Sequence, residues 1–173
     1  MSPSQDTFSK GDWIVHANYG IGQIKGKETK VLEQENQAFY RVKTFNGVYW
    51  LPVEHVDVDH IRPVASKSQM KRALTLIRKP PAELPDNHRS RKKEIAETFQ
   101  DLSLNKKARM IRDLHGKRVS SRLNFSEGDA FEKMKKQFLN EWSVIRSEDR
   151  ATLEKKLQQA LKTSVAKSSN GDD

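Results

Sequence analysis

Four glycines fall within residues 10–28, KGDWIVHANYGIGQIKGKE, where they could form a loop that binds a phosphate. Such a loop needs its glycines directly after a strand and at the start of a helix, so that free backbone N–H groups face the anion. Here Gly20, Gly22 and Gly26 are followed by more strand-like sequence, and no helical pattern begins before about residue 67. We therefore expect a turn at Gly20 and a bulge or close strand crossing at Gly22.

Metal-binding and catalytic patterns are also missing from the sequence. His55 and His60 are close, with Asp57 and Asp59 between them, but this spacing matches no zinc signature. The chain has no cysteine, which excludes disulfides, thiolate metal sites and cysteine nucleophiles. There is no G-x-S-x-G, H-E-x-x-H or glycine-rich kinase motif. We expect no metal, no cofactor and no enzymatic activity.

The positive charge lies in one part of the chain. Residues 1–66 hold 7 Lys/Arg and 8 Asp/Glu, a net charge of −1, whereas residues 67–125 hold 16 and 6, a net charge of +10. Residues 126–173 hold 9 of each. A basic block of this kind favours a polyanion through counterion release, so it indicates nucleic-acid contact. The alternative is a solvated basic surface that aids solubility.

Residues 7–66 have the pattern of short β-strands. The runs DWIVH, GIGQIKGKE, TKVLEQ, AFYRVKTF and VYWLPV are rich in β-branched and aromatic residues. Turn residues separate them at Asn18, at Glu35-Asn36 and at Asn46-Gly47, the last being the strongest hairpin signal. Five short strands in this length predict a small, strongly bent barrel.

After Pro63 the apolar pattern changes to a helical period. Met70, Ala73, Leu74 and Ile77 share one helical face, and the Pro-rich segment KPPAELPDN follows them. Four further apolar stripes have a helical period: Ile95, Phe99 and Leu102; Leu104, Ala108, Ile111 and Leu114, ended by Gly116; Phe131, Met134, Phe138, Trp142 and Ile145, capped by Ser126; Leu153, Leu157, Ala160 and Leu161, capped by Ser147.

The predicted fold class is therefore α+β, with a small β-barrel followed by an all-α domain. We expect the barrel at residues 7–66, a connecting helix and Pro-rich linker at 67–86, a helical domain at 87–165 and a disordered tail at 166–173. No apolar run approaches the roughly 18 residues of a membrane span, and the N-terminus lacks the apolar segment of a secretory signal.

Tyr49 and Trp50 are neighbours in a predicted strand, so they point to opposite faces and one of them should face outward. An exposed aromatic side chain on a strand is a reasonable anchor for a protein partner. The alternative is that this side chain packs on the helical module.

Several segments resemble a known family. K-G-D-W-I-V-H-A-N-Y-G-I-G, residues 10–22, resembles the opening of the RNA polymerase-interacting domain, and Y-W-L-P-V-E-H-V, residues 49–56, resembles its closing strand. This domain occurs in the CarD family of bacterial transcription regulators and in transcription-repair coupling factor. Three segments of the helical half are similar to the C-terminal segments of CarD: A-R-M-I-R-D-L (108–114), L-N-F-S-E (123–127) and L-N-E-W-S (139–143). The resemblance covers roughly residues 8–163.

The resemblance implies a Tudor/SH3-like barrel that docks on the β subunit of RNA polymerase by adding a strand to it. Lys30 and Trp50 match polymerase-contacting positions of the family, and Tyr49 and Pro52 lie in the same matching segment. The helical domain is implied to contact double-stranded promoter DNA and to stabilise the open complex. Lys133 matches a DNA-facing lysine of the family. We expect a cytoplasmic, nucleoid-associated protein that is a monomer when free.

One position departs from the family pattern. Well-studied members carry a Trp after the linker and insert it into the minor groove, but the matching stretch here is N-H-R-S-R, residues 87–91, with His88 in that place. Histidine is smaller and more polar, which weakens such a wedge. Arg89, Arg91, Lys92 and Lys93 still supply candidate phosphate contacts. The alternative function is a polymerase- or ribosome-associated RNA-binding module without a promoter role.

Overall fold

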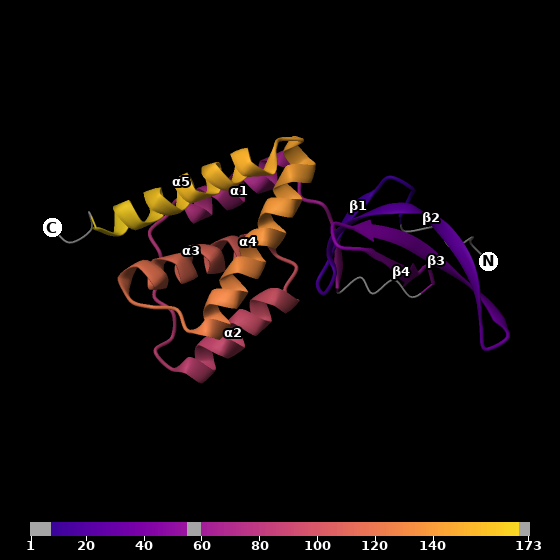
Figure 1. Cartoon of the computed structure of the whole chain (residues 1–173), viewed down its shortest axis with the longest axis horizontal. Helices are drawn as coiled ribbons and strands as arrows, with labels where there is room; N and C mark the ends of the chain where they lie inside the picture. The colour runs from indigo at the N-terminus through magenta and orange to yellow at the C-terminus, as the bar shows by residue number, and fades with distance from the viewer. Residues whose placement is uncertain (1–7, 55–59, 170–173) are drawn as a thin grey trace. The chain divides into compact units, whose positions relative to one another are not determined.

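The computed structural model describes residues 8–54 and 60–169 and divides the chain into two compact units, Met1–Val64 and Ala65–Asp173. In the described residues all strands belong to the first unit and all helices to the second (Figure 1). The predicted α+β fold class is therefore confirmed. The division falls two residues before the boundary that we expected after residue 66.

The N-terminal unit is one antiparallel sheet with strand order β4-β3-β2-β1-β5. Its strands are β1 (Trp13–His16), β2 (Gly20–Leu32), β3 (Glu35–Thr44), β4 (Val48–Pro52) and β5 (Ile61–Pro63). Among the residues that the structure describes, β4 pairs only with β3 and β5 only with β1, so the sheet is not closed between these two edges.

The longest strand, β2, differs from the sequence-based expectation. We expected two strands, at residues 20–28 and 29–34, but the structure has one strand with a bulge between Ile24 and Gly26. Gly26 has a φ of +149°, which residues with a side chain rarely adopt. The glycine therefore bends the strand without ending it, and the fifth strand of the sheet is β5 instead.

The turn between β2 and β3 lies two residues earlier than expected. Leu32 pairs with Glu35, so the chain reverses at Glu33 and Gln34, which have φ values of 49° and 71°. A two-residue hairpin turn requires such positive φ values, which glycine or asparagine usually supplies. This turn has neither residue, and for that reason the sequence did not reveal it.

Gly22 lies where β2 and β3 approach each other closely. A Cβ atom at Gly22 would lie 2.6 Å from Cγ1 of Val42, so the strands approach too closely for any side chain there. This confirms the expected close approach at Gly22. Val42 belongs to a buried hydrophobic cluster of this unit, which consists of Ile14, Ile24, Tyr40, Val42, Leu51 and Ile61.

The C-terminal unit contains five helices in its described residues. They are α1 (Lys67–Ile77), α2 (His88–Gln100), α3 (Leu104–Ser120), α4 (Phe125–Arg146) and α5 (Arg150–Ser169). All four residues predicted for the inner face of α1, Met70, Ala73, Leu74 and Ile77, are buried in the same core as the other helices. This helix, which we expected as a connector, is therefore part of the helical unit.

Three helix boundaries differ from those that we expected from the sequence. We expected Gly116 to end a helix, but α3 continues to Ser120. Gly116 instead leaves room for Pro81, since an added Cβ would lie 2.5 Å from Cβ of Pro81. Asn124, and not Ser126, caps α4. Ser147 is the C-terminal cap of α4, with a φ of 52°, and does not begin α5.

The last helix also runs beyond its expected end. α5 continues to Ser169, whereas we expected the ordered domain to end at residue 165. Its side chains at Leu153, Leu157, Ala160 and Leu161 are buried, as their spacing predicted.

Candidate functional site

The exposed face of the sheet carries a cluster around Trp50, which lies on the edge strand β4. The Trp50 indole Nε1 donates a hydrogen bond of 2.8 Å to Oε2 of Glu28, and Nζ of Lys30 lies 3.6 Å from the Trp50 ring centroid. Nε of Arg41, which pairs with Trp50 across the strands, lies 3.4 Å from Oε1 of Glu28. The Trp50 side chain is still 42% exposed. The structure thus brings Lys30 and Trp50 together on an accessible surface.

Tyr49 has a different environment from Trp50. Its ring stacks on Tyr19 at 4.4 Å and meets the ring of His16 edge-on at 5.6 Å. Its hydroxyl is buried and has no hydrogen-bond partner among the described residues. Burial, and to a smaller extent the nearby Tyr19, raises the pKa of Tyr49 to about 12. Tyr49 therefore packs against the core of the sheet, while Pro52 ends β4 opposite Phe39.

The start of α2 carries the cations that we expected to bind phosphate, but they are not equivalent. Arg89, Lys92 and Lys93 are exposed. The Arg91 side chain is only 14% exposed. Its Nε donates to Oε1 of Glu127 at 2.7 Å, and its Nη1 donates to the carbonyl oxygens of residues 85 and 86. Arg91 is thus engaged inside the unit.

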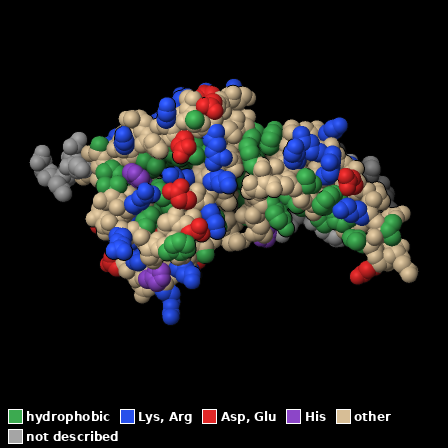
Figure 2. Space-filling view, viewed as in Figure 1, with side chains coloured by type: hydrophobic (Ala, Val, Ile, Leu, Met, Phe, Trp, Pro, Cys, Tyr) green, Lys and Arg blue, Asp and Glu red, His purple; other side chains and the backbone are tan. Residues whose placement is uncertain are grey.

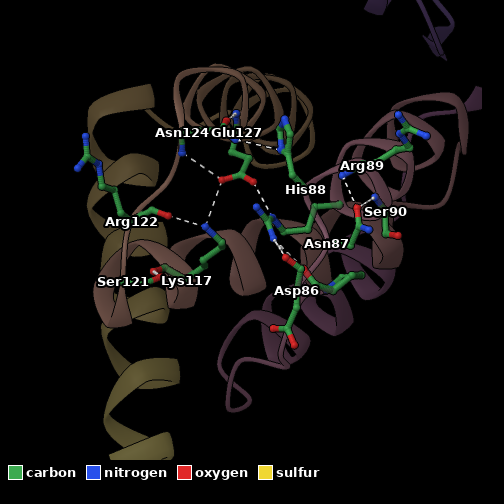
Figure 3. A network of polar contacts seen from close by, with 12 residues as sticks. Asp86, Asn87, His88, Arg89, Ser90, Lys117, Ser121, Arg122, Asn124 and Glu127 are labelled. Atoms are coloured by element: carbon green, nitrogen blue, oxygen red, sulfur yellow. Dashed lines mark hydrogen bonds and ion pairs between the residues drawn. The ribbon is translucent and has the colours of Figure 1, made fainter.

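Glu127 is the centre of this polar network (Figure 3). Its side chain is 3% exposed and accepts hydrogen bonds from Arg91, from Nζ of Lys117 at 3.3 Å and from the backbone N–H of Asn124 at 3.1 Å. Burial by itself would raise the pKa of Glu127, but these donors outweigh it and hold the pKa below the ordinary value. The network joins the segment before α2, the end of α3 and the start of α4.

His88 lies beside this network, where the starts of α2 and α4 meet. Its Nδ1 lies 3.3 Å from Nδ2 of Asn124, the residue that caps α4 with a reciprocal bond from Glu127. Figure 3 shows that the side chains of Arg89 and Arg122 point away from Glu127, so their charges are available outside the network.

Phe125 is a candidate that sequence reasoning missed. It is the first residue of α4, follows Asn124 directly and is 91% exposed. An aromatic side chain this exposed adds little to the folded core, so it is a candidate for contact with a partner. Its position in the sequence could have indicated this exposure. Phe125 directly follows a residue able to cap a helix and lies outside the buried stripe that begins at Phe131.

The remaining predicted cations are exposed but partly paired. Lys133 lies on α4, with its side chain 66% exposed, and forms an ion pair of 3.1 Å with Asp129. Lys93 lies 3.8 Å from Glu97 on α2. Exposed pairs of this kind contribute little to stability and leave the cation accessible. Figure 2 shows Lys and Arg side chains spread over the visible face of the helical unit, with Asp and Glu among them.

The described residues contain neither a metal-binding cluster nor a helix able to span a membrane. No group of three His, Asp or Glu side chains within residues 8–54 and 60–169 could hold a metal ion. The candidates His55, Asp57 and Asp59 lie outside the described residues. No described helix combines the length and the apolar character needed to cross a membrane.

Comparisons with known proteins cover both units. The family model of the CarD-like/TRCF RID domain matches residues 8–65, and that of the CarD C-terminal domain matches residues 72–158. A protein of Bacillus subtilis (strain 168) named "Putative transcription factor YdeB" is 24% identical over 141 residues, which span 80% of this chain and 92% of the relative.

Proposed function

This chain belongs to the CarD family of transcription factors, and on that premise we propose that it docks on the RNA polymerase β subunit and contacts promoter DNA. RNA polymerase is the partner that the N-terminal domain of the family implies. The proposed action is to hold the promoter open through binding alone, with no chemical step. Both partners lie in the bacterial cytoplasm at the nucleoid, where we propose that the protein acts.

The proposed docking surface is the edge strand β4 together with the cluster of Glu28, Lys30, Arg41 and Trp50. Within the described part of the chain, β4 pairs with β3 alone, so its other edge can add to a strand of the polymerase. Trp50 is held by Glu28 on one side and Lys30 on the other, so little side-chain freedom is lost on binding. The position of Trp50, held between Glu28 and Lys30 on an edge strand, is the main observation that supports the docking proposal.

Trp50→Ala is expected to weaken binding to purified polymerase by about 2 kcal/mol or more, roughly thirtyfold in Kd, because a central aromatic anchor is lost. Lys30→Glu should weaken it as well, by placing a second negative charge beside Glu28. The measurement is titration of labelled full-length protein with polymerase.

Phe45→Ala is the matched control for Trp50→Ala, since Phe45 is a 53% exposed aromatic in the turn between β3 and β4 and lies outside the Trp50 cluster. It should bind polymerase like the unaltered protein. Equal losses in the two variants, or a large fall in Tm for Trp50→Ala alone, would contradict the docking role of Trp50.

The proposed DNA-contacting surface lies at the adjoining starts of α2 and α4. Arg89, Lys92 and Lys93 provide exposed positive charge on α2, and Lys133 extends it along α4. We propose that these four cations contact phosphates, which position the protein without reading the sequence. Arg91 is left out of this set because Glu127 holds its guanidinium. We assign Arg91 to positioning the start of α2.

Neutralising two of these cations together, with Arg89→Gln and Lys92→Gln, should weaken binding to all duplex sequences about equally. The slope of log K against log salt should become shallower by about two units, one for each lost phosphate contact. The matched control is Lys155→Gln with Lys162→Gln, which removes the same charge from exposed sites on α5.

An equal change of slope in the α5 control would contradict the assignment of the contacts to α2. Arg91→Gln provides a second comparison: we expect it to lower Tm and to leave the salt slope nearly unchanged. Tighter binding of structured RNA than of duplex DNA would favour the alternative of an RNA-binding module.

A further inference from the structure

A second basic site lies away from the proposed DNA surface, in a cavity of about 480 Å³ within the helical unit. Its walls come from α1, α4 and α5. In the described residues, α2 packs on α3 and α4 and makes no contact with α1 or α5. Figure 1 shows α1 and α5 side by side, with α2 on the other side of α3. The cavity is therefore separate from the start of α2.

The lining of the cavity has only one sign of charge. No Asp or Glu side chain lines it, and its cationic residues are Lys67, Lys71, Arg78, Arg146 and Lys156. Lys156 is paired with Glu148 at 2.7 Å. The structure gives the other four no ion pair with any described residue. Four uncompensated cations around one hollow create a strongly positive local potential.

Two of these charges oppose the folding of α1. Lys67 is the first residue of that helix, where the helix dipole disfavours a cation, and no acidic residue stands in the first turn. Lys71 lies one turn further on, so the two lysines also form a repulsive i,i+4 pair. Arg78 and Arg146 lie at helix C-termini, where the dipole already favours them. Helix stability therefore accounts for positive charges at Arg78 and Arg146, but it does not account for those at Lys67 and Lys71.

Trp142 belongs to the lining of the cavity, but its indole N–H is itself buried. Trp142 is 4% exposed, lines the cavity and has an indole Nε1 without a partner among the described residues. An indole N–H can only donate, and a buried donor without an acceptor is costly. Met70 and Leu74 form apolar wall beside it. The cavity therefore combines a cationic rim with closely packed, largely buried apolar residues beneath it.

We propose that this cavity binds a small molecule that carries several phosphate groups, which the lysine and arginine rim holds. The volume lies in the range of about 300–1,000 Å³ that small-ligand pockets occupy. Multiple phosphates match four uncompensated cations better than one phosphate does. A concave site suits a small molecule better than a duplex backbone.

The test uses ATP as the probe and the full-length protein labelled with ¹⁵N at tryptophan. The chain has 3 tryptophans, so its spectrum has three indole N–H signals, which Trp13→Phe and Trp50→Phe assign. ATP should shift the Trp142 signal saturably and leave the other two in place. Adenosine at the same concentration should shift none of them, because it lacks the phosphates.

Lys67→Ala with Lys71→Ala should weaken ATP binding at least tenfold by calorimetry and leave Tm unchanged or slightly higher. The matched control, Lys155→Ala with Lys162→Ala, removes the same charge from α5 outside the cavity and should bind ATP normally. The proposal fails if ATP does not shift the Trp142 signal or if both double variants lose affinity equally. It also fails if duplex DNA, rather than ATP, shifts that signal.

Discussion

Glu127→Gln is expected to destabilise the helical unit by about 3 kcal/mol, the lower end of the range for breaking a buried ion pair. The Glu127 side chain is 3% exposed and the Arg91 side chain 14%, so the variant leaves a guanidinium charge poorly solvated. Arg91 keeps its bonds to the carbonyl oxygens of residues 85 and 86, which limits the loss. Urea unfolding at neutral pH measures the difference.

The same variant has a predictable pH dependence. Because the pKa of Glu127 is lowered in the folded protein, its contribution is present above the pKa of an unfolded glutamate, about 4.3, and is lost as the pH falls through the folded pKa. The stability difference between the unaltered protein and Glu127→Gln should therefore be full at pH 7 and should shrink under acid.

Asp129→Asn is the control for Glu127→Gln. Asp129 is a carboxylate of the same helix, but it is 53% exposed and pairs with an exposed lysine, so its replacement should change stability by less than about 0.5 kcal/mol. A double-mutant cycle between Glu127 and Arg91 isolates their coupling. Equal effects of the Glu127 and Asp129 variants would show that the buried network is not what stabilises this corner of the unit.

Phe125→Ala is expected to shorten the lifetime of the open promoter complex about tenfold or more. A 91% exposed phenyl ring, directly after Asn124, which contacts His88 at the start of α2, has the shape and polarity of a wedge that props open an unstacked base step. Such a step costs a few kcal/mol to unstack, so loss of the wedge has a large kinetic effect. Tm should not change. The measurement is open-complex half-life under competitor challenge, with polymerase from the same source.

His88→Ala tests whether histidine or phenylalanine acts as the wedge. His88 contacts Asn124 and is smaller than the tryptophan that the family pattern places there, so its replacement should change the half-life little. Val119→Ala removes another exposed apolar side chain of the helical unit, 57% exposed, and should have no effect. If His88→Ala shortens the half-life as much as deletion of the helical unit while Phe125→Ala does not, histidine is the wedge.

The sequence alone predicted several strands, the buried face of α1 and the distribution of charge along the chain. Runs rich in β-branched and aromatic residues predicted strands β1, β3 and β4, and the apolar stripe from Met70 to Ile77 predicted the buried face of α1. The charge difference between residues 1–66 and 67–125 depends on composition alone. These features follow from backbone geometry over a few residues, so neighbours in the chain are enough to specify them.

Only the tertiary structure decided which similar residues have different roles. Arg91 and Lys92 are adjacent cations, yet the packing of α2 on α4 places Arg91 against Glu127, 36 residues away, and leaves Lys92 exposed. The role of Gly116 depends likewise on the approach of Pro81. Such outcomes depend on which distant segments meet and on the cost of burying an unpaired charge, and neither quantity is a property of a local stretch of sequence.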